Sequence, residues 1–474
     1  MGPRRPAARV VIAGAAAAAL LASGCGARWS SAEQALERAR LEAGAKGTSG
    51  ATTGSATRSN SAITPAAGGP SSTVAGAGSA PSGGDAAGAT AGATGATGGA
   101  EAASLPCRAH SDAPGVTDTQ ITVGTINSLS GPLPGLGASH LAATQAYIAY
   151  RNSLGGVCGR QIVLKSADDS GDNGTFRSEV SDMSSQVIAV IGGVAGGADG
   201  GVDVINSNQL PVVGDSVTPQ LDDVATYYPV RPHLPDNHVA TPKYRYLYDQ
   251  GVRKAAIVYV AASGSPKQAE DVERPQMEAA GIQVVLDQAL PLSTLSYDST
   301  ARAVANSGAD YLIFIHAAEA SAAMAQAIAD TGYKLKYADY IVAYGSNFIA
   351  LAGQAAEGAT NWIVTLPNED GGTVPEQSNY LKWMAQTVPD SVVDPFAAQA
   401  WAGSKALFDT LEALPGAISR AALLSQLAAT ATYDAGGLLG PVEFGAKKSE
   451  GCVVGMIVQN GAWRRLTPDQ GFLC

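Results

Sequence analysis

Ser216 and Thr218 are the residues whose types and spacing point most directly to chemistry. They lie in the segment 216–220 (SVTPQ), where Thr218 is a favourable N-cap residue and Pro219 would take the first helical position. A helix start offers unpaired N–H groups and a positive dipole end, which suit a carboxylate. Since capping and ligand contact can coexist at Thr218, the pattern indicates either a ligand-binding helix start or a plain helix cap.

A glycine-rich loop, residues 193–201 (GVAGGADGG), follows an expected strand at 187–191. Its glycines would let backbone N–H groups approach a ligand closely, and Gly196 and Gly197 are the candidates for that contact. No Lys-Ser or Lys-Thr follows these glycines, and the sequence has no G-x-G-x-x-G motif. The loop is therefore typical of neither a phosphate loop nor a dinucleotide-binding loop, and we expect no cofactor.

Enzymatic chemistry has little support in the sequence. Neither the G-x-S-x-G nor the H-E-x-x-H pattern of secreted hydrolases occurs, so a secreted hydrolase is the least favoured alternative. His233 and His238 flank Asp236, but Pro232 and Pro235 make this segment a loop, and the spacing is not typical of a metal site. We interpret the segment as lying close to a hinge and expect no metal.

The candidate residues follow short apolar runs that alternate with helical segments. Strands are expected at 120–126, 162–166, 187–191 and 210–214, and helices at 140–152, 175–186 and 202–208. This alternation predicts parallel βαβ units, in which ligands bind beyond the carboxyl ends of the strands. Asp168 and Asp169 also follow a strand, and we interpret them as a solvated acidic loop.

An ordered set of motifs resembles the solute-binding proteins of branched-chain amino-acid ABC transporters. The motifs are Leu129-Ser-Gly-Pro132, Leu154-Gly-Gly-Val-Cys-Gly-Arg-Gln-Ile162, Asp168-Asp169, Ala189-Val-Ile-Gly-Gly193, Leu210-Pro-Val212, Ala355-Ala-Glu-Gly358 and Gly440-Pro-Val-Glu-Phe-Gly445. The resemblance spans residues 117–474. It implies the α/β clamshell of type I periplasmic binding proteins: two Rossmann-like lobes, joined by three crossovers, that close on a small solute and present it to an ABC permease.

In the first lobe, the resemblance assigns roles to residues that follow three of the strands. Ser216 and Thr218 match positions that hold the α-carboxylate and α-amino groups of an amino acid. Where family members carry hydroxyl side chains, this chain has Gly196 and Gly197, which leaves only main-chain donors. The first loop contributes two more predicted ligand contacts, Ser130 and Leu136, of which Leu136 would wall the side-chain pocket.

In the second lobe, the family usually carries an aromatic residue and a carboxylate around the ligand's ammonium group. Tyr344 would supply the aromatic face. Glu319 is better placed to open the next helix, where the dipole favours a negative charge. His316 is either a wall of the cleft or a satisfied histidine at a strand end. An amino acid or similar small polar solute is the expected ligand.

We expect lobe 1 at about 117–236 and 367–432, and lobe 2 at about 237–366 and 433–474. Further strands are expected at 255–260, 282–286, 311–315 and 340–343, further helices at 374–388 and 396–414, and a hairpin at 453–458 and 462–466. A receptor that senses the same ligand and signals through a partner protein is the alternative function. No attached signalling domain is evident in the sequence, which favours transport.

The N-terminus predicts export and a lipid anchor. Arginines precede the apolar run Val10–Leu21, which is too short to span a bilayer as a mature helix. The sequence 21–25 (LASGC) resembles a bacterial lipoprotein cleavage box, so residues 1–24 are expected to be a signal peptide and Cys25 to carry the lipid. An ordinary secretory signal is the alternative. We therefore expect an extracytoplasmic protein anchored to the cell membrane.

A tether is expected between the lipid and the folded domain, which should occupy residues 105–474. Within 25–104, residues 47–104 are almost entirely Ala, Gly, Ser and Thr. Such a segment buries too little apolar surface to offset the entropy of ordering, so we interpret it as disordered.

Four cysteines remain if Cys25 carries lipid, and an even number in an oxidising compartment suggests two disulfides. Three pairings are possible; we favour Cys107–Cys158 and Cys452–Cys474. The formal net charge of −11 disfavours nucleic acid as a partner. The expected partners are therefore a small solute, a membrane permease and the lipid anchor, and the protein itself is expected to be a monomer.

Overall fold

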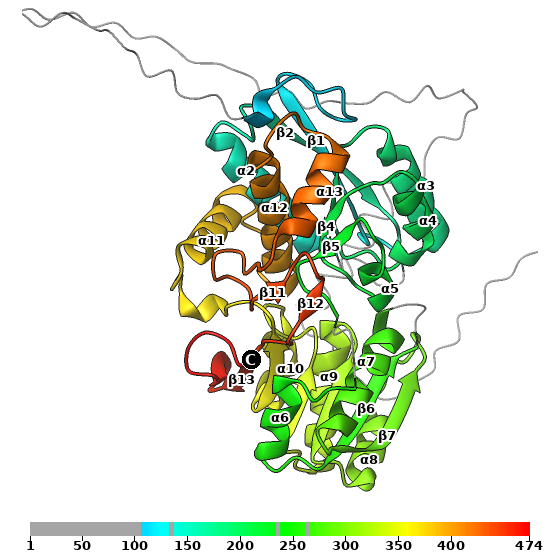
Figure 1. The fold of residues 1–474 in the computed structure, drawn as a ribbon. Coiled ribbons are helices and arrows are strands. Elements are labelled where there is room, and N and C mark those ends of the chain that lie inside the picture. The colour runs from blue at the N-terminus through cyan, green and yellow to red at the C-terminus, as the bar shows by residue number, and fades with distance from the viewer. Residues whose placement is uncertain (1–105, 132–136, 234–237, 262–264) are drawn as a thin grey trace, which may run out of the picture. The chain divides into compact units, whose positions relative to one another are not determined.

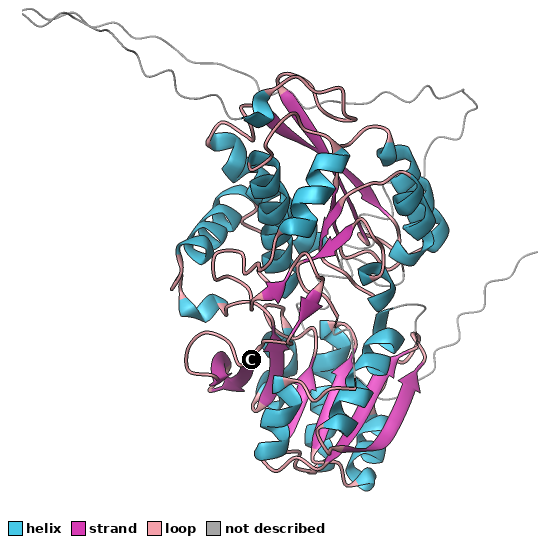
Figure 2. Cartoon of the chain, viewed as in Figure 1, coloured by secondary structure: helices cyan, strands magenta, loops and turns pink. Residues whose placement is uncertain are grey.

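The computed structural model describes residues 106–131, 137–233, 238–261 and 265–474. The expected signal peptide, the lipid-bearing Cys25, the tether and Leu136 all lie outside the described residues. The described chain contains two large β-sheets, each in its own lobe and each flanked by helices (Figures 1 and 2). This two-lobed α/β fold confirms the fold class expected from the sequence.

The first lobe is built on five parallel strands in the order β2-β1-β3-β4-β5. The strands are β1 (Gln120–Asn127), β2 (Gln161–Asp168), β3 (Val190–Gly192), β4 (Val212–Gly214) and β5 (Tyr227–Pro229). The helical elements of this lobe are η1 (Pro106–Arg108), α2 (Ala138–Ser153), α3 (Asn173–Ser184), η2 (Ala198–Gly201), α4 (Val202–Ser207), α5 (Pro219–Asp222), α11 (Pro375–Thr387), α12 (Pro395–Glu412) and α13 (Arg420–Ala429).

The first sheet is buried on both faces, because successive apolar side chains of its strands point to opposite sides. Ile191 and Val213 belong to the hydrophobic core that includes Trp401 of α12. Their neighbours Val190 and Val212 belong to a separate core that includes Phe176 of α3 and residues of α4. Because successive side chains of a strand point to opposite faces, such short apolar strands require helices on both sides.

The second lobe repeats this arrangement. Five parallel strands, in the order β7-β6-β8-β9-β10, are extended at the β10 edge by the antiparallel strands β13 and β14. The strands are β6 (Lys254–Val260), β7 (Gln283–Leu290), β8 (Tyr311–Ile315), β9 (Tyr337–Tyr340), β10 (Ala359–Ile363), β13 (Val454–Gln459) and β14 (Ala462–Thr467). The helices are α6 (Pro242–Asp249), α7 (Ser265–Ala279), α8 (Asp298–Ser307), α9 (Ala318–Thr331), α10 (Phe348–Ala352) and η3 (Gly353–Ala356).

The chain passes between the two lobes three times: after β5, after β10 and before β13. The second passage leads into the short helix η4 (Asn368–Asp370), and the third follows the small hairpin of β11 (Val442–Glu443) and β12 (Lys448–Ser449). The expected start of the last lobe-2 segment, near residue 433, is too early. Leu439, Val442 and Phe444 share the hydrophobic core of Trp401, so this stretch packs with lobe 1.

One expected strand is displaced. The sequence predicts a strand at 340–343, whereas β9 ends at Tyr340 after pairing with β8 and β10. The N–H of Ala343 donates to the carbonyl oxygen of Tyr340 at 3.0 Å, which makes a turn and ends the strand before Tyr344. The prediction that Glu319 opens a helix is confirmed, because it lies in the first turn of α9.

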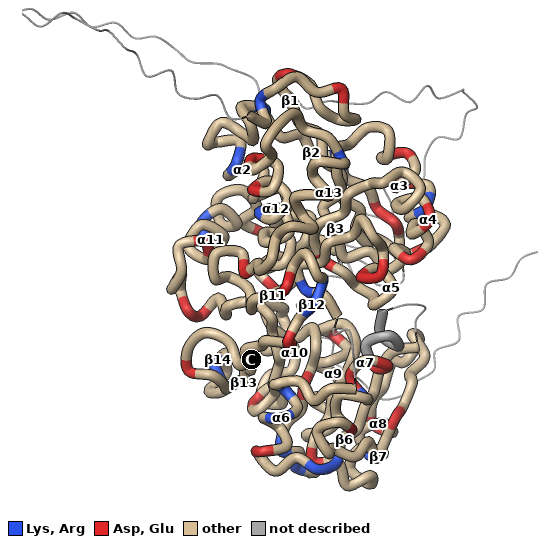
Figure 3. Tube along the Cα trace, in the orientation of Figure 1, with Lys and Arg blue, Asp and Glu red and all other residues tan. Residues whose placement is uncertain are grey.

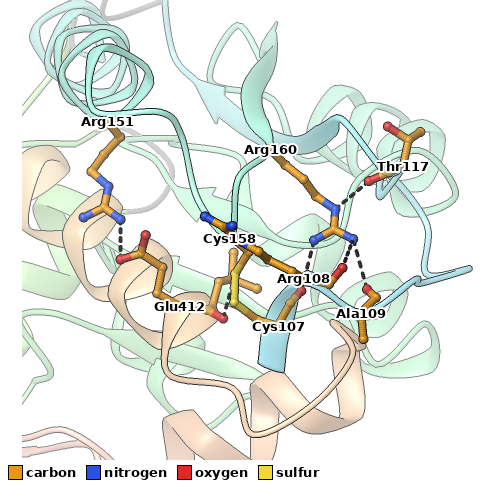
Figure 4. Close-up of a disulfide and its surroundings, with 9 residues drawn as sticks. Cys107, Arg108, Ala109, Thr117, Arg151, Cys158, Arg160 and Glu412 are labelled. Atoms are coloured by element: carbon orange, nitrogen blue, oxygen red, sulfur yellow. Dashed lines mark hydrogen bonds and ion pairs between the residues drawn. A yellow bond between two sulfur atoms is a disulfide. The ribbon is translucent and has the colours of Figure 1, made fainter. Parts of the chain in front are cut away.

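Both favoured disulfides are present. Cys107 and Cys158 are joined with their Cα atoms 5.7 Å apart, and Cys452 and Cys474 with theirs 4.3 Å apart. The first disulfide lies beside Arg160, which is only 2% exposed (Figure 4). The Arg160 guanidinium donates to the carbonyl oxygens of Thr117, Cys107, Arg108 and Ala109 at 2.6–3.3 Å. Disulfide and arginine together fasten the chain leading into β1.

Among the described helices, none combines the length and apolar character needed to cross a bilayer.

Replacing Cys107 and Cys158 together by Ser should lower the free energy of unfolding by roughly 4 kcal/mol, because the unfolded chain loses a loop constraint. The disulfide closes a sequence separation of 51 residues. The matched Cys452→Ser/Cys474→Ser variant frees a separation of 22 residues, and should lose roughly 3 kcal/mol. Urea denaturation followed by circular dichroism measures both. Unchanged midpoints in both variants would contradict this account.

Candidate functional site

The strand order identifies one edge of each sheet as the candidate site. In both lobes the first strand lies between the second and the third, so the crossovers on its two sides run in opposite directions. Ligands of such sheets bind at this switch point, beyond the carboxyl ends of the strands. In lobe 1 the switch point lies after β1 and β3; in lobe 2 it lies after β6 and β8.

The buried carboxylate of Asp169 joins three loops at the lobe 1 switch point. Its Oδ1 accepts hydrogen bonds from the Ser128 hydroxyl at 2.7 Å and the Gly171 N–H at 3.0 Å, and its Oδ2 accepts from the Gly197 N–H at 2.8 Å. Asp169 is 0% exposed. The interpretation of this residue as part of a solvated acidic loop is therefore wrong.

The neighbouring carboxylate, Asp168, holds the loop after β1. It accepts from the Ser130 hydroxyl at 2.6 Å and from the N–H groups of Leu129, Ser130 and Ser170 at 2.8–3.3 Å. Burial alone would raise the pKa of Asp168, but these hydrogen bonds outweigh it and lower the pKa to about 2. Ser130, a predicted ligand contact, therefore lies at the surface with its hydroxyl proton directed to Asp168.

Gly196 and Gly197 do not offer free main-chain donors in this conformation. The Gly196 N–H donates to the Ser128 hydroxyl oxygen at 2.9 Å, and the Gly197 N–H donates to Asp169. Gly197 also lies against the next loop: a Cβ on Gly197 would fall 2.3 Å from the carbonyl oxygen of Asp172. Gly197 thus permits close packing of two loops. Both N–H groups have partners within the protein, and their contact with a ligand stays a prediction.

Ser216 and Thr218 also have partners within the protein. Thr218 has the extended backbone of an N-cap, but its side chain does not cap α5; the hydroxyl donates to Asp199 Oδ1 at 2.6 Å. The Ser216 hydroxyl lies 2.6 Å from Asp222 Oδ1 and 3.0 Å from the Thr218 carbonyl oxygen. The two residues are 0% and 2% exposed. They are brought together as expected, yet they face carboxylates rather than solvent.

Further charged groups surround this pair. The second oxygen of Asp222 lies 3.1 Å from His233 Nδ1. Asp215, which follows β4 and is 1% exposed, accepts from the Ser216 N–H at 2.9 Å through Oδ1, and its buried Oδ2 has no hydrogen-bond partner among the described residues. Burial raises the pKa of Asp215, and the charge of Arg231 opposes that effect. Figure 3 shows acidic positions beside α5.

The loop containing His233 gives no metal site in the part of the chain that the structure describes. Asp236 lies outside the described residues, and within them no three His, Cys, Asp or Glu side chains are grouped so as to hold a metal ion. His233 is instead tied to Asp222 through both its ring and its backbone N–H.

His316 lies at the lobe 2 switch point, directly after β8. Its Nδ1 accepts a hydrogen bond from the Ala317 N–H at 2.8 Å, and its ring stacks on Phe314 with centroids 5.8 Å apart. Burial lowers the pKa of His316, which favours the neutral ring. Because Nδ1 accepts the Ala317 N–H, the proton of the neutral ring belongs on Nε2. Nε2 is buried without a hydrogen-bond partner among the described residues. This donor suits a ligand acceptor, and the role of His316 as a cleft wall stays a prediction.

Tyr344 is not the open aromatic face expected from the sequence. It is 3% exposed and packs against Trp463, with ring centroids 5.6 Å apart. Its hydroxyl donates to Glu369 Oε2 at 2.6 Å and accepts from the Asn368 N–H at 2.7 Å. The displaced end of β9 explains the difference, since Tyr344 follows a turn that directs it onto the second crossover.

The sequence analysis did not identify the carboxylates that accept hydrogen bonds from the hydroxyl groups of Ser216 and Thr218. Asp199 lies inside the glycine-rich loop, and Asp222 lies at the end of the short helix α5. No local sequence pattern indicates these contacts, because Thr218 and Asp199 come from loops after different strands and meet only in the folded protein. The adjacent pair Asp168-Asp169 was visible, and its position directly after a strand at the switch point could have indicated a structural role.

Comparison with known proteins agrees with this architecture. A model of the periplasmic binding protein family matches residues 120–459. A fatty acid ABC transporter substrate-binding protein from Thermomonospora curvata is 20% identical with a TM-score of 0.65, over 76% of this chain and 94% of that one. A leucine-binding protein from Thermotoga maritima is 13% identical with a TM-score of 0.61, over 73% and 98%.

A substrate-binding protein of an ABC transporter from Aeropyrum pernix is 17% identical with a TM-score of 0.65, over 74% of this chain and 97% of that one. At these identities the solved structures establish the fold alone. No curated protein matches the sequence.

Replacing Asp169 by Asn should destabilise the protein by about 1–3 kcal/mol, because one oxygen that accepts buried hydrogen bonds becomes an NH2 group. Asp172→Asn is the matched control: Asp172 caps α3 by accepting from the Thr175 N–H, and Asn caps a helix as well as Asp does. Urea denaturation compares the two variants. Equal stability of Asp169→Asn and Asp172→Asn would show that Asp169 does not hold the three loops.

Proposed function

This chain belongs to the periplasmic binding protein family, and on that premise we propose that it is the extracytoplasmic solute-binding component of an ABC importer. The observation that carries the proposal is the repeated strand order, 2-1-3-4-5, which gives each lobe a switch point at its carboxyl edge. Members of the family bind solutes and are not enzymes, and we extend that absence of catalysis to this chain.

We propose closure of the two lobes as the mechanism. Three crossovers link the lobes, so a small rotation at these segments changes their separation. In the present conformation the lobes meet at Gly345, where a Cβ would lie 2.6 Å from the Val393 carbonyl oxygen. A solute shifts such an equilibrium only by its greater affinity for one state, so it must contact both lobes to favour closure.

The proposed solute is an amino acid or a similar small polar molecule. The leucine-binding and fatty-acid-binding neighbours show that the fold accepts both polar and apolar cargo. Here a carboxylate that approached Ser216 and Thr218 would have to replace Asp222 and Asp199 as acceptors. An ammonium or another donor group of the solute fits these carboxylates better, and His316 Nε2 offers a donor for an acceptor group.

We further propose that Cys25 carries the lipid that anchors the protein outside the membrane, that residues 25–104 tether the folded domain to it, and that a monomer delivers the solute to an ABC permease. The sequence at 21–25 (LASGC) and the composition of residues 47–104 support the anchor and the tether. Membership of the periplasmic binding protein family supports an ABC permease as the partner.

A thermal-unfolding screen of the purified protein tests the proposal. Amino acids, small amides, short-chain carboxylates, fatty acids and polyols serve as candidate ligands. The cognate solute at a hundred times its dissociation constant should add about 2.7 kcal/mol of stability. Thr218→Ala should weaken its binding, because Thr218 is a proposed ligand contact, whereas Thr430→Ala, a change outside both carboxyl edges, should not. Equal binding by the two variants would remove Thr218 from the proposed site.

Stabilisation by fatty acids alone, and by no polar compound, would contradict the proposed solute class. It would remain consistent with a solute-binding role in transport. No response to any class would favour the alternative, a receptor that signals through a partner protein.

A further inference from the structure

A pocket of about 480 Å3 lies where the second crossover, the segment before β11 and the C-terminal tail meet. Its volume is within the range of sites that bind small molecules. Leu366, Val374, Leu439, Pro441 and Phe472 give it apolar walls. Neither Ser130, Ser216, Thr218 nor His316 lines it, so it is distinct from the candidate solute site.

The walls of this pocket are fixed by several interactions. Arg465 pairs with Asp370 through two hydrogen bonds of 2.9 and 2.5 Å and also donates to the carbonyl oxygens of Pro468 and Gly471. Leu473 exchanges two backbone hydrogen bonds with Val453, beside the Cys452–Cys474 disulfide. Phe472 packs against the cores of both lobes. A pocket with fixed walls requires little ordering when a ligand binds.

The charge at the pocket is negative. Arg465 is the one cation among the described residues that line it, and Asp370 neutralises that charge. Asp434 and Asp469 also line the pocket; both are exposed, and neither forms an ion pair with a described residue. Among the described residues, the carboxylate of Asp434 accepts only the N–H of Gly436, at 2.9 Å. Two carboxylates thus border an apolar cavity without a compensating positive charge.

We infer that this pocket binds a small organic cation with an apolar body, such as an alkylamine or arylalkylamine. The apolar walls would remove the body from water, the ring of Phe472 would favour a nearby cation, and Asp434 and Asp469 would attract the ammonium group. The same carboxylates would repel an anion of equal shape. The inference does not depend on which solute the carboxyl edges bind.

Three probes of matched shape test the charge requirement: 4-phenylbutylamine, 4-phenylbutanol and 4-phenylbutyrate. Isothermal titration calorimetry on the full chain should show saturable binding of the amine, weaker binding of the alcohol and no binding of the carboxylate. In Asp434→Asn/Asp469→Asn the affinity for the amine should fall by roughly tenfold, because two exposed charge interactions are removed. Both side chains are exposed, so the variant should fold normally.

Two further variants make the test specific. Thr373→Trp fills the pocket from an exposed lining position without changing its charge, and should abolish binding of the amine. Asp330→Asn/Asp390→Asn removes two exposed carboxylates elsewhere and should bind the amine as the wild type does. Absence of saturable amine binding to the wild type, equal binding to Thr373→Trp, or equal binding of the carboxylate probe would overturn the inference.

Discussion

The carboxylate of Asp169 is the constraint on which the first lobe's binding edge depends. It accepts hydrogen bonds from the loop after β1, from its own loop and from the loop after β3, while it is wholly buried. A buried charge is tolerated only when hydrogen bonds replace its hydration. The three loops are therefore held together whether or not a solute is present, which favours a first lobe that is formed in advance and a second lobe that moves onto it.

The contacts of the second lobe are consistent with a first lobe that is formed in advance and a second lobe that moves. Tyr344 and Arg465 hold the second crossover through Glu369 and Asp370, and Gly345 allows the loop after β9 to touch Val393. These interactions lie at the crossover side of the molecule. His316, at the other switch point, keeps a buried Nε2 without a partner among the described residues. The second lobe thus combines satisfied hinge contacts with an unsatisfied donor where a solute is expected.

The fold could be predicted from the sequence because it depends on local periodicity. Val190 and Ile191, or Val212 and Val213, supply the two faces of strands buried on both sides, and the helices between them follow from their length. The sequence analysis also favoured the pairing of cysteines that the structure shows, Cys107–Cys158 and Cys452–Cys474. The site could not be predicted to the same depth. Thr218 meets Asp199, and Tyr344 meets Glu369, through contacts between distant segments that leave no mark in local sequence patterns.

Hydrogen–deuterium exchange, with and without the solute that stabilises the protein, tests the central claim most directly. The claim is that one solute binds between the carboxyl edges and that its contacts join the two lobes. It predicts slower exchange at residues 215–218 in lobe 1 and at 316–318 in lobe 2, saturating at the same solute concentration. Protection confined to one lobe, or to segments outside both edges, would contradict it.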